Sequence, residues 1–117
     1  MGLAAIREQR RQDMVQRLRQ EVAALDLPET VTVAVIGSWA RGDWAGDSDI
    51  DLLVIGPEQE IQRARFQLME IADDVIALDR DRWNRRRAAG DPWVSGLEEE
   101  ALALVPCRKT MGNAALR

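Results

Sequence analysis

The sequence predicts an α+β fold, with a small mixed β-sheet of three or four strands and flanking helices packed on one side of the sheet. Three observations carry this prediction. Short apolar segments rich in β-branched residues alternate with longer segments whose apolar residues recur at helical spacing. Gly and Pro residues separate these segments. The length of 117 residues suits one domain with a modest core.

Four segments have the periodicity or the end signals of helices. The segment from Ala5 to Leu25 gathers its Val and Leu residues on one face, and the segment from Ile61 to Ala72 does the same with Ile, Leu and Ala. A short basic helix is expected from Arg80 to Ala89. The pair Asp91-Pro92 is typical of an N-cap followed by proline at the first helical position. The last helix is expected to run on from there through Leu97, Leu102 and Leu104 to Pro106.

Three segments are expected to be strands. Val31–Ile36 is apolar on both faces, which is typical of an interior strand. Asp49–Ile55 and Asp74–Leu78 are expected to be the second and third strands. The connection Gly37–Ser48, between the first two strands, is dense in turn-forming residues.

The composition excludes several kinds of chemistry and of partner. The chain has no histidine, which excludes a histidine relay and a zinc site built on imidazoles. The formal net charge is -4, so a general electrostatic footprint for nucleic acid is not expected. Cys107 is the single cysteine and the N-terminal residues lack a hydrophobic signal core, so we expect a cytoplasmic protein without membrane contact. Residues 1–105 are expected to form the domain, and residues 106–117 a mobile C-terminal tail.

Asp49 and Asp51 are the first candidates for chemistry. At positions i and i+2 of a strand, their carboxylates point to the same face, about 6.5 to 7 Å apart along the backbone. Hard oxygen ligands with no His or Cys nearby favour Mg²⁺, and two such ions would hold the attacking and leaving oxygens of a phosphoryl displacement. The alternative is a solvated strand end, although Asp is depleted in strands.

Gly37-Ser38, at the end of the first strand, is the second candidate. Glycine lets a phosphate approach the backbone, Ser38 offers a hydroxyl group, and residues 38–41 can start a short helix whose amides face an anion. An ordinary turn is the alternative, and it is the commoner reason for a Gly-Ser pair. Arg41 could bind a phosphate through its guanidinium group, or it could form a structural salt bridge with Asp43 or Asp47.

Together these residues resemble the signature of a known superfamily. The run IGSWARGDWAGDSDIDLLV has an apolar residue, Gly-Ser, a spacer and Asp-x-Asp, followed by an apolar strand. This pattern is similar to that of the DNA polymerase beta type nucleotidyltransferases. The spacer from Trp39 to Ser48 matches the minimal nucleotidyltransferases (MNT) of that superfamily, and the resemblance extends to about Val105. Gly37–Ser48 is called the signature loop below.

The resemblance implies a role in nucleotide binding for four residues of the signature loop. Gly37 and Ser38 would bind the triphosphate of ATP, the substrate, and Arg41 would assist them. Ser48 would shape the turn that precedes the acidic pair.

The resemblance also implies a metal site made of carboxylates. Asp49 and Asp51 would hold Mg²⁺, with two ions expected, and a third carboxylate on the next strand would complete the site and assist deprotonation of the acceptor hydroxyl. Asp74 matches this third position best, and Asp73 is the neighbouring candidate. Asp79, at the far end of the strand, is a poorer one.

The minimal members of the superfamily imply a partner. They are commonly encoded beside small helical HEPN proteins, as antitoxins that silence a ribonuclease toxin by moving AMP from ATP to one of its hydroxyl groups. The alternative is a non-catalytic module of the same fold that neutralises its partner by occlusion. Trp39, Trp44 and the arginines of Arg80–Arg87 are the exposed candidates for docking, and the two tryptophans could also cover a nucleotide base. The alternatives are packing roles for most of the tryptophans and a solvated helix face for the arginines. Glu98, Glu99 and Glu100 are expected to be surface residues.

Overall fold

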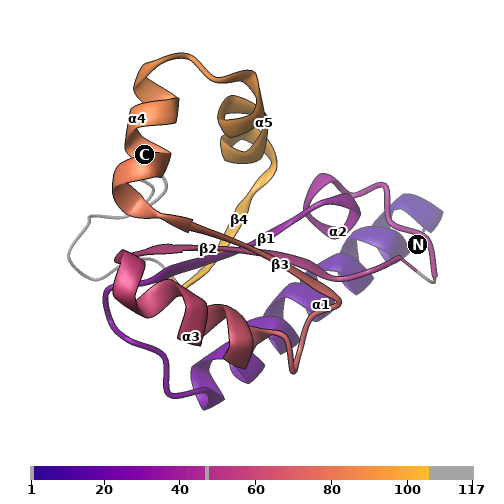
Figure 1. Cartoon of the computed structure of the whole chain (residues 1–117). Helices are drawn as coiled ribbons and strands as arrows, with labels where there is room; N and C mark the ends of the chain where they lie inside the picture. The colour runs from indigo at the N-terminus through magenta and orange to yellow at the C-terminus, as the bar shows by residue number, and fades with distance from the viewer. Residues whose placement is uncertain (1, 47, 106–117) are drawn as a thin grey trace.

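A mixed four-stranded sheet forms the centre of the structure, a computed structural model that describes residues 2–46 and 48–105 (Figure 1). The strand order is β3-β2-β1-β4; β2 and β3 are parallel, and β1 is antiparallel to both of its neighbours. The predicted fold class is confirmed. The elements, in chain order, are α1 (Leu3–Ala24), β1 (Thr32–Ile36), α2 (Ser38–Arg41), β2 (Asp51–Gly56), α3 (Glu58–Leu68), β3 (Asp74–Asp79), α4 (Arg80–Ala88), α5 (Pro92–Glu100) and β4 (Leu102–Val105).

Helices cover both faces of the sheet, so the prediction that they pack on one side is wrong. In Figure 1, α1 and α3 lie on one side of the strands and α4 and α5 on the other. The central strand β2 shows why. Its alternate residues Leu52 and Val54 pack into the cluster with α1 and α3, whereas Leu53 and Ile55 pack into a second cluster that includes the fully buried Trp83 of α4. A strand that is apolar on both faces needs a covering layer on each.

The last helix ends at Glu100, and the segment predicted to continue it as a helix is strand β4. Asp91 is the N-cap, as predicted, and its carboxylate accepts a hydrogen bond of 2.8 Å from the Trp93 N–H. At the other end, Ala101 is extended, and Leu102 then pairs with Val35 of β1. Ladder hydrogen bonds to the open edge of β1 therefore override the local helix pattern. Pro106, Cys107 and the predicted tail lie outside the described residues.

The other predicted helices and strands are confirmed with small shifts at their ends. The largest shift that bears on function is at β2, which was expected from Asp49 and begins at Asp51. Asp49 therefore lies in the connection, two residues before the strand. Among the residues that the structure describes, none of the helices combines the length and the apolar composition that a bilayer crossing requires.

The strand register brings one end of every strand to the same edge of the sheet. Asp51 pairs with Ile36 at the end of β1 and with Asp74 at the start of β3. Leu102, at the start of β4, pairs with Val35. The last residues of β1 and the first residues of the other three strands thus meet at one edge, and the signature loop leaves β1 there.

Candidate active site

Four aspartates gather at this edge and are called the acidic edge: Asp49, Asp51, Asp73 and Asp74. Asp51 and Asp74 are direct neighbours in the parallel register of β2 and β3. Asp49 precedes β2, and Asp73 precedes β3. The crossover from β2 through α3 to β3 is what joins these carboxylates, because it returns the chain to the end of the sheet at which β2 began.

The two neighbouring candidates for the third carboxylate have different surroundings. The Asp73 carboxylate accepts a hydrogen bond of 2.8 Å from the Ile50 N–H. The Ile50 carbonyl in turn accepts from the N–H groups of Asp73 and Asp74, at 2.9 and 3.3 Å. Asp73 thus ties the start of β3 to the residue before β2, while Asp74 is exposed beside Asp51. Asp79, at the far end of β3, caps α4 by accepting from the Arg82 N–H.

Charge is crowded at Asp51. Burial raises the pKa of the Asp51 carboxyl above its usual value, and the negative charges of Asp74, Asp49 and Asp73 raise it further. Only Arg41 acts in the opposite direction among the causes of this shift. A cation placed at the acidic edge would relieve this repulsion.

Gly37 lies directly against the Asp51 carboxylate. Its φ is 77° and its ψ is -154°, a backbone conformation that is essentially restricted to glycine. A Cβ atom added to Gly37 would lie 2.6 Å from Asp51 Oδ2. The close approach of the loop backbone to the acidic edge therefore requires glycine at this position.

Hydrogen bonds within the signature loop shape the turns near its start and its end. Ser38 begins the short helix α2, as predicted, and its carbonyl accepts from the Gly42 N–H at 2.9 Å. Ser48 Oγ accepts a hydrogen bond of 2.7 Å from the Ala45 N–H, and the Ser48 N–H donates to the Ala45 carbonyl at 3.0 Å. Ser48 thus closes the turn that leads into the acidic edge.

Arg41 makes two ion pairs, with Asp43 at 3.2 Å and with Glu100 at 3.1 Å. The pKa of Arg41 is raised above its usual value, first by the hydrogen bond and charge of Asp43 and then by Glu100. Of the two structural partners considered for Arg41, Asp43 is the one in contact; Asp47 lies outside the described residues.

Sequence reasoning missed Glu100, which was expected to be a simple surface residue. Its side chain is only 20% exposed. Its carboxylate accepts a hydrogen bond of 2.6 Å from the Gly37 N–H and also forms the ion pair with Arg41. No local signal identifies this residue, since its position depends on the pairing of β4 with β1.

Trp39 and Trp44 are buried, so the prediction that they are exposed for docking is wrong. Their rings stack, with centroids 4.4 Å apart, and the guanidinium of Arg7 lies 4.4 Å from the Trp44 ring centroid. Arg7 also donates to the Trp44 carbonyl at 2.6 Å, and Arg11 donates to the carbonyls of Trp39 and Ala40 at 2.9 and 2.6 Å. Large aromatic rings gain most from burial, and here α1 covers them.

The basic helix α4 is mixed in its exposure. Arg80 contacts β1, because its guanidinium donates to Thr32 Oγ1 at 2.9 Å. Arg86 pairs with Asp91 at 2.8 Å and lies over the half-exposed Trp93 ring. Arg82 and Arg85 are the exposed arginines of this helix.

Asp51 and Asp74 are the carboxylates that the strand register sets side by side. In residues 2–46 and 48–105, no three His, Cys, Asp or Glu side chains lie close enough together to hold a metal by themselves. Magnesium is commonly held by one or two carboxylates, with water and substrate phosphates completing its shell. The neighbouring pair Asp51 and Asp74, with its excess of negative charge, fits that mode of binding.

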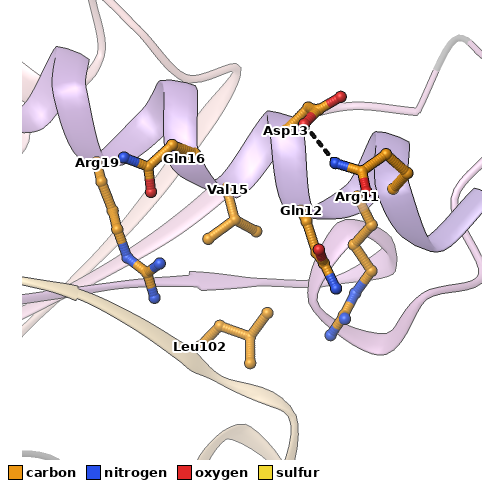
Figure 2. A pocket seen from close by; sticks show the side chains of 8 residues that line it. Arg11, Gln12, Asp13, Val15, Gln16, Arg19 and Leu102 are labelled. Atoms are coloured by element: carbon orange, nitrogen blue, oxygen red, sulfur yellow. Dashed lines mark hydrogen bonds between the residues drawn. The ribbon is translucent and has the colours of Figure 1, made fainter.

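A groove of about 440 Å³ lies elsewhere, between α1 and β4 (Figure 2). Arg19 crosses from α1 to donate to the Ala103 carbonyl at 3.2 Å. The lining comes from α1 and from the first residue of β4, and it includes none of the acidic edge. The groove therefore lies where α1 packs against β4, and it is separate from the candidate active site.

The chain is similar to a known family of domains and to several curated proteins. A family model described as a nucleotidyltransferase domain matches residues 15–89. The CCA-adding enzyme of Haloarcula marismortui is 37% identical over 90 residues, which cover 74% of this chain and 18% of that enzyme. The CCA-adding enzyme of Halobacterium salinarum is 36% identical over 91 residues, which cover 76% of this chain and 19% of that enzyme. The chain thus spans less than a fifth of the length of these relatives. No solved structure matches it.

Proposed function

The chain belongs to the nucleotidyltransferase domain family, and from that premise we propose that it moves AMP from ATP to a hydroxyl group of a protein partner. One observation carries the proposal: the register places Asp51 beside Asp74, with the Gly37 backbone directly against the Asp51 carboxylate. This arrangement supports the proposal because it sets the two carboxylates that we assign to the metal against the loop that we assign to the phosphates.

The proposed reaction is a displacement at the α-phosphorus of ATP. The acceptor hydroxyl oxygen forms a bond to that phosphorus, the bond to the bridging oxygen of the β-phosphate breaks, and pyrophosphate leaves with the electron pair. The hydroxyl proton passes to the Asp74 carboxylate. Gly37 N–H, Ser38 and Arg41 hold the triphosphate, so that the chain contributes chiefly positioning and charge neutralisation.

Magnesium is the proposed metal, held by Asp51 and Asp74 with Asp49 nearby. When bound it neutralises phosphate charge and aligns the attacking and leaving oxygens. The carboxylate donors and the repulsion among them support a hard divalent cation.

The proposed acceptor is a HEPN-type toxin, with this chain as its antitoxin. This part of the proposal is supported by the resemblance of the signature loop to the minimal nucleotidyltransferases. The relatives named CCA-adding enzymes support nucleotide transfer, but because the chain spans so little of them, their own acceptor is not carried over.

Intact-protein mass spectrometry tests the proposal. After incubation with ATP and Mg²⁺, the HEPN-type partner is expected to gain one or more units of about 329 Da, the mass added by an AMP group. The Asp51→Asn variant of this chain serves as the control. A partner that binds but gains no mass would contradict transfer, and a partner that neither binds nor gains mass would contradict the antitoxin role.

A second candidate is the non-catalytic module that acts by occlusion. The position of Glu100 favours it, since this carboxylate already holds the Gly37 N–H and Arg41 that the triphosphate would need. The same mass measurement separates the two candidates, because occlusion predicts tight binding with no gain of mass.

The identity of the third carboxylate is tested by replacing Asp74 and Asp73 with Asn, one at a time. Asp74→Asn is expected to lower the transfer rate by about 100-fold, because it removes one metal ligand and the proton acceptor. Asp73→Asn keeps a side-chain oxygen for the Ile50 N–H and is expected to stay within about threefold of the wild-type rate. Single-turnover rates with labelled ATP measure both. The reverse ranking would move the third carboxylate to Asp73.

A further inference from the structure

Glu100 occupies two of the three groups that the proposed function assigns to phosphate, the Gly37 N–H and Arg41. Its Oε2 atom lies 2.6 Å from the Gly37 nitrogen and 3.1 Å from Arg41 Nη1. The Glu100 side chain is 20% exposed, whereas that of Arg41 is 50% exposed. An anion with two charge-assisted or backbone donors is thus already seated beside the acidic edge.

The fold, rather than a chance side-chain rotamer, brings Glu100 to this place. In the antiparallel pairing of β1 and β4, Ala34 lies opposite Ala103 and Val35 opposite Leu102. Beyond the end of this ladder, Gly37 follows Val35 by two residues and Glu100 precedes Leu102 by two residues, so the antiparallel register brings the two close to each other. Glu100 is also the last residue of α5, so its backbone is fixed by a helix on one side and by a strand on the other.

We propose that Glu100 is an internal competitor for the phosphates of the nucleotide, which must displace its carboxylate from the Gly37 N–H and Arg41 before they can bind. This inference rests on the proposed function, because it takes those donors to be the phosphate seat. A carboxylate and a phosphate cannot share two donors at hydrogen-bond distance, and their like charges repel. Glu100 therefore lowers nucleotide affinity and makes binding depend on a shift at the junction between α5 and β4.

Calorimetric titration with ATP and Mg²⁺, and separately with inorganic tripolyphosphate, tests the competition. Glu100→Ala removes the carboxylate from the Gly37 N–H and Arg41. Glu100→Gln keeps an acceptor for the Gly37 N–H while removing the charge. Both variants are expected to bind each ligand about 10-fold to 100-fold more tightly than the wild type, the range for release of a hydrogen bond to a charged group. Glu99→Gln is the matched control, since it removes the same charge from an exposed neighbour on the same helix and is expected to change nothing.

The outcomes separate this inference from the proposed function. Tighter binding by both Glu100 variants supports the competitor role, even where the wild type binds too weakly to measure. Unchanged or weaker binding than a wild type that does bind overturns it, makes Glu100 a residue that positions Gly37 and Arg41, and leaves nucleotide binding intact. Absence of binding by every protein, each shown folded by circular dichroism, overturns both.

The Gly37 amide gives a second readout that does not depend on affinity. In the wild type its proton is hydrogen-bonded to a carboxylate, and its NMR signal is expected to move upfield in Glu100→Ala. Tripolyphosphate is then expected to restore a downfield shift in that variant, and in the wild type to perturb the signals of Glu100, Ala101 and Leu102. A Gly37 signal that does not respond to either change would contradict the exchange of anions at this N–H.

Discussion

Asp51→Asn is expected to lower the rate of AMP transfer by about 10³-fold while the protein stays folded. The asparagine keeps the shape of the side chain next to Gly37 but cannot supply an anionic oxygen to the metal, a loss of several kcal/mol in stabilisation of the transition state. Transfer of labelled AMP in a single turnover measures the effect. Undiminished transfer by this variant would remove the acidic edge from the mechanism.

The same substitution has a second expected result, in the pH dependence of stability. Because the pKa of Asp51 is raised, the folded protein keeps a proton on this carboxyl between the ordinary value of 3.8 and the folded-state pKa, whereas the unfolded chain has released it. The contribution of this group to stability is therefore fully present below 3.8 and is lost as the pH rises through the folded-state pKa. Asp51→Asn is neutral at every pH, so its melting temperature should exceed that of the wild type at neutral pH. That advantage should vanish in acid; a variant that melts lower at neutral pH would contradict the crowding of charge.

Gly37→Val is expected to abolish nucleotide binding and also to destabilise the fold. A side chain here must adopt a backbone conformation that costs about 1 to 3 kcal/mol. Its Cβ would lie 2.6 Å from the Asp51 carboxylate and would push the loop away from the acidic edge. Backbone strain and the clash with Asp51 thus act at the same residue, which is also the proposed phosphate-binding residue.

Gly46→Ala is the matched control in the same loop, because a Cβ at Gly46 meets nothing within 4 Å. Thermal melting and ATP titration of the two variants give the comparison. We expect Gly46→Ala to behave as the wild type in both. If Gly37→Val retained wild-type affinity for ATP, the Gly37-Ser38 pair would be an ordinary turn.

The strands around the signature loop could be predicted from the sequence because their signals are local. Val31–Ile36 is β-branched or apolar throughout and has apolar residues on both faces, a pattern that is typical of an interior strand with two covered faces. Asp49 and Asp51 interrupt an apolar run, and such an interruption has no packing explanation. The same reasoning applied to both faces of β2 would also have predicted the second helical layer, since Leu53 and Ile55 need cover as much as Leu52 does.

What could not be predicted depends on pairs of residues far apart in the chain. The segment from Glu98 to Val105 is rich in Glu, Ala and Leu, which favour a helix, and it becomes a strand at Leu102 only because β1 has an open edge. Glu100 reaches Gly37 as a result of that pairing. Trp39 is buried for a similar reason. Arg11, which donates to its carbonyl, lies 28 residues earlier in the chain.

Contacts between the start of α1 and the signature loop link the stability of these two segments. Arg7 and Arg11 lie in the first half of α1, ahead of the region that the family model matches. Both donate to loop carbonyls, and the Arg7 guanidinium also lies over the Trp44 ring. Fraying of these first turns would remove those donors and uncover the Trp44 ring, so we expect the helix end and the loop to open together. The free energy of that local opening, and not that of global unfolding, therefore sets how often the loop loses its ordered form.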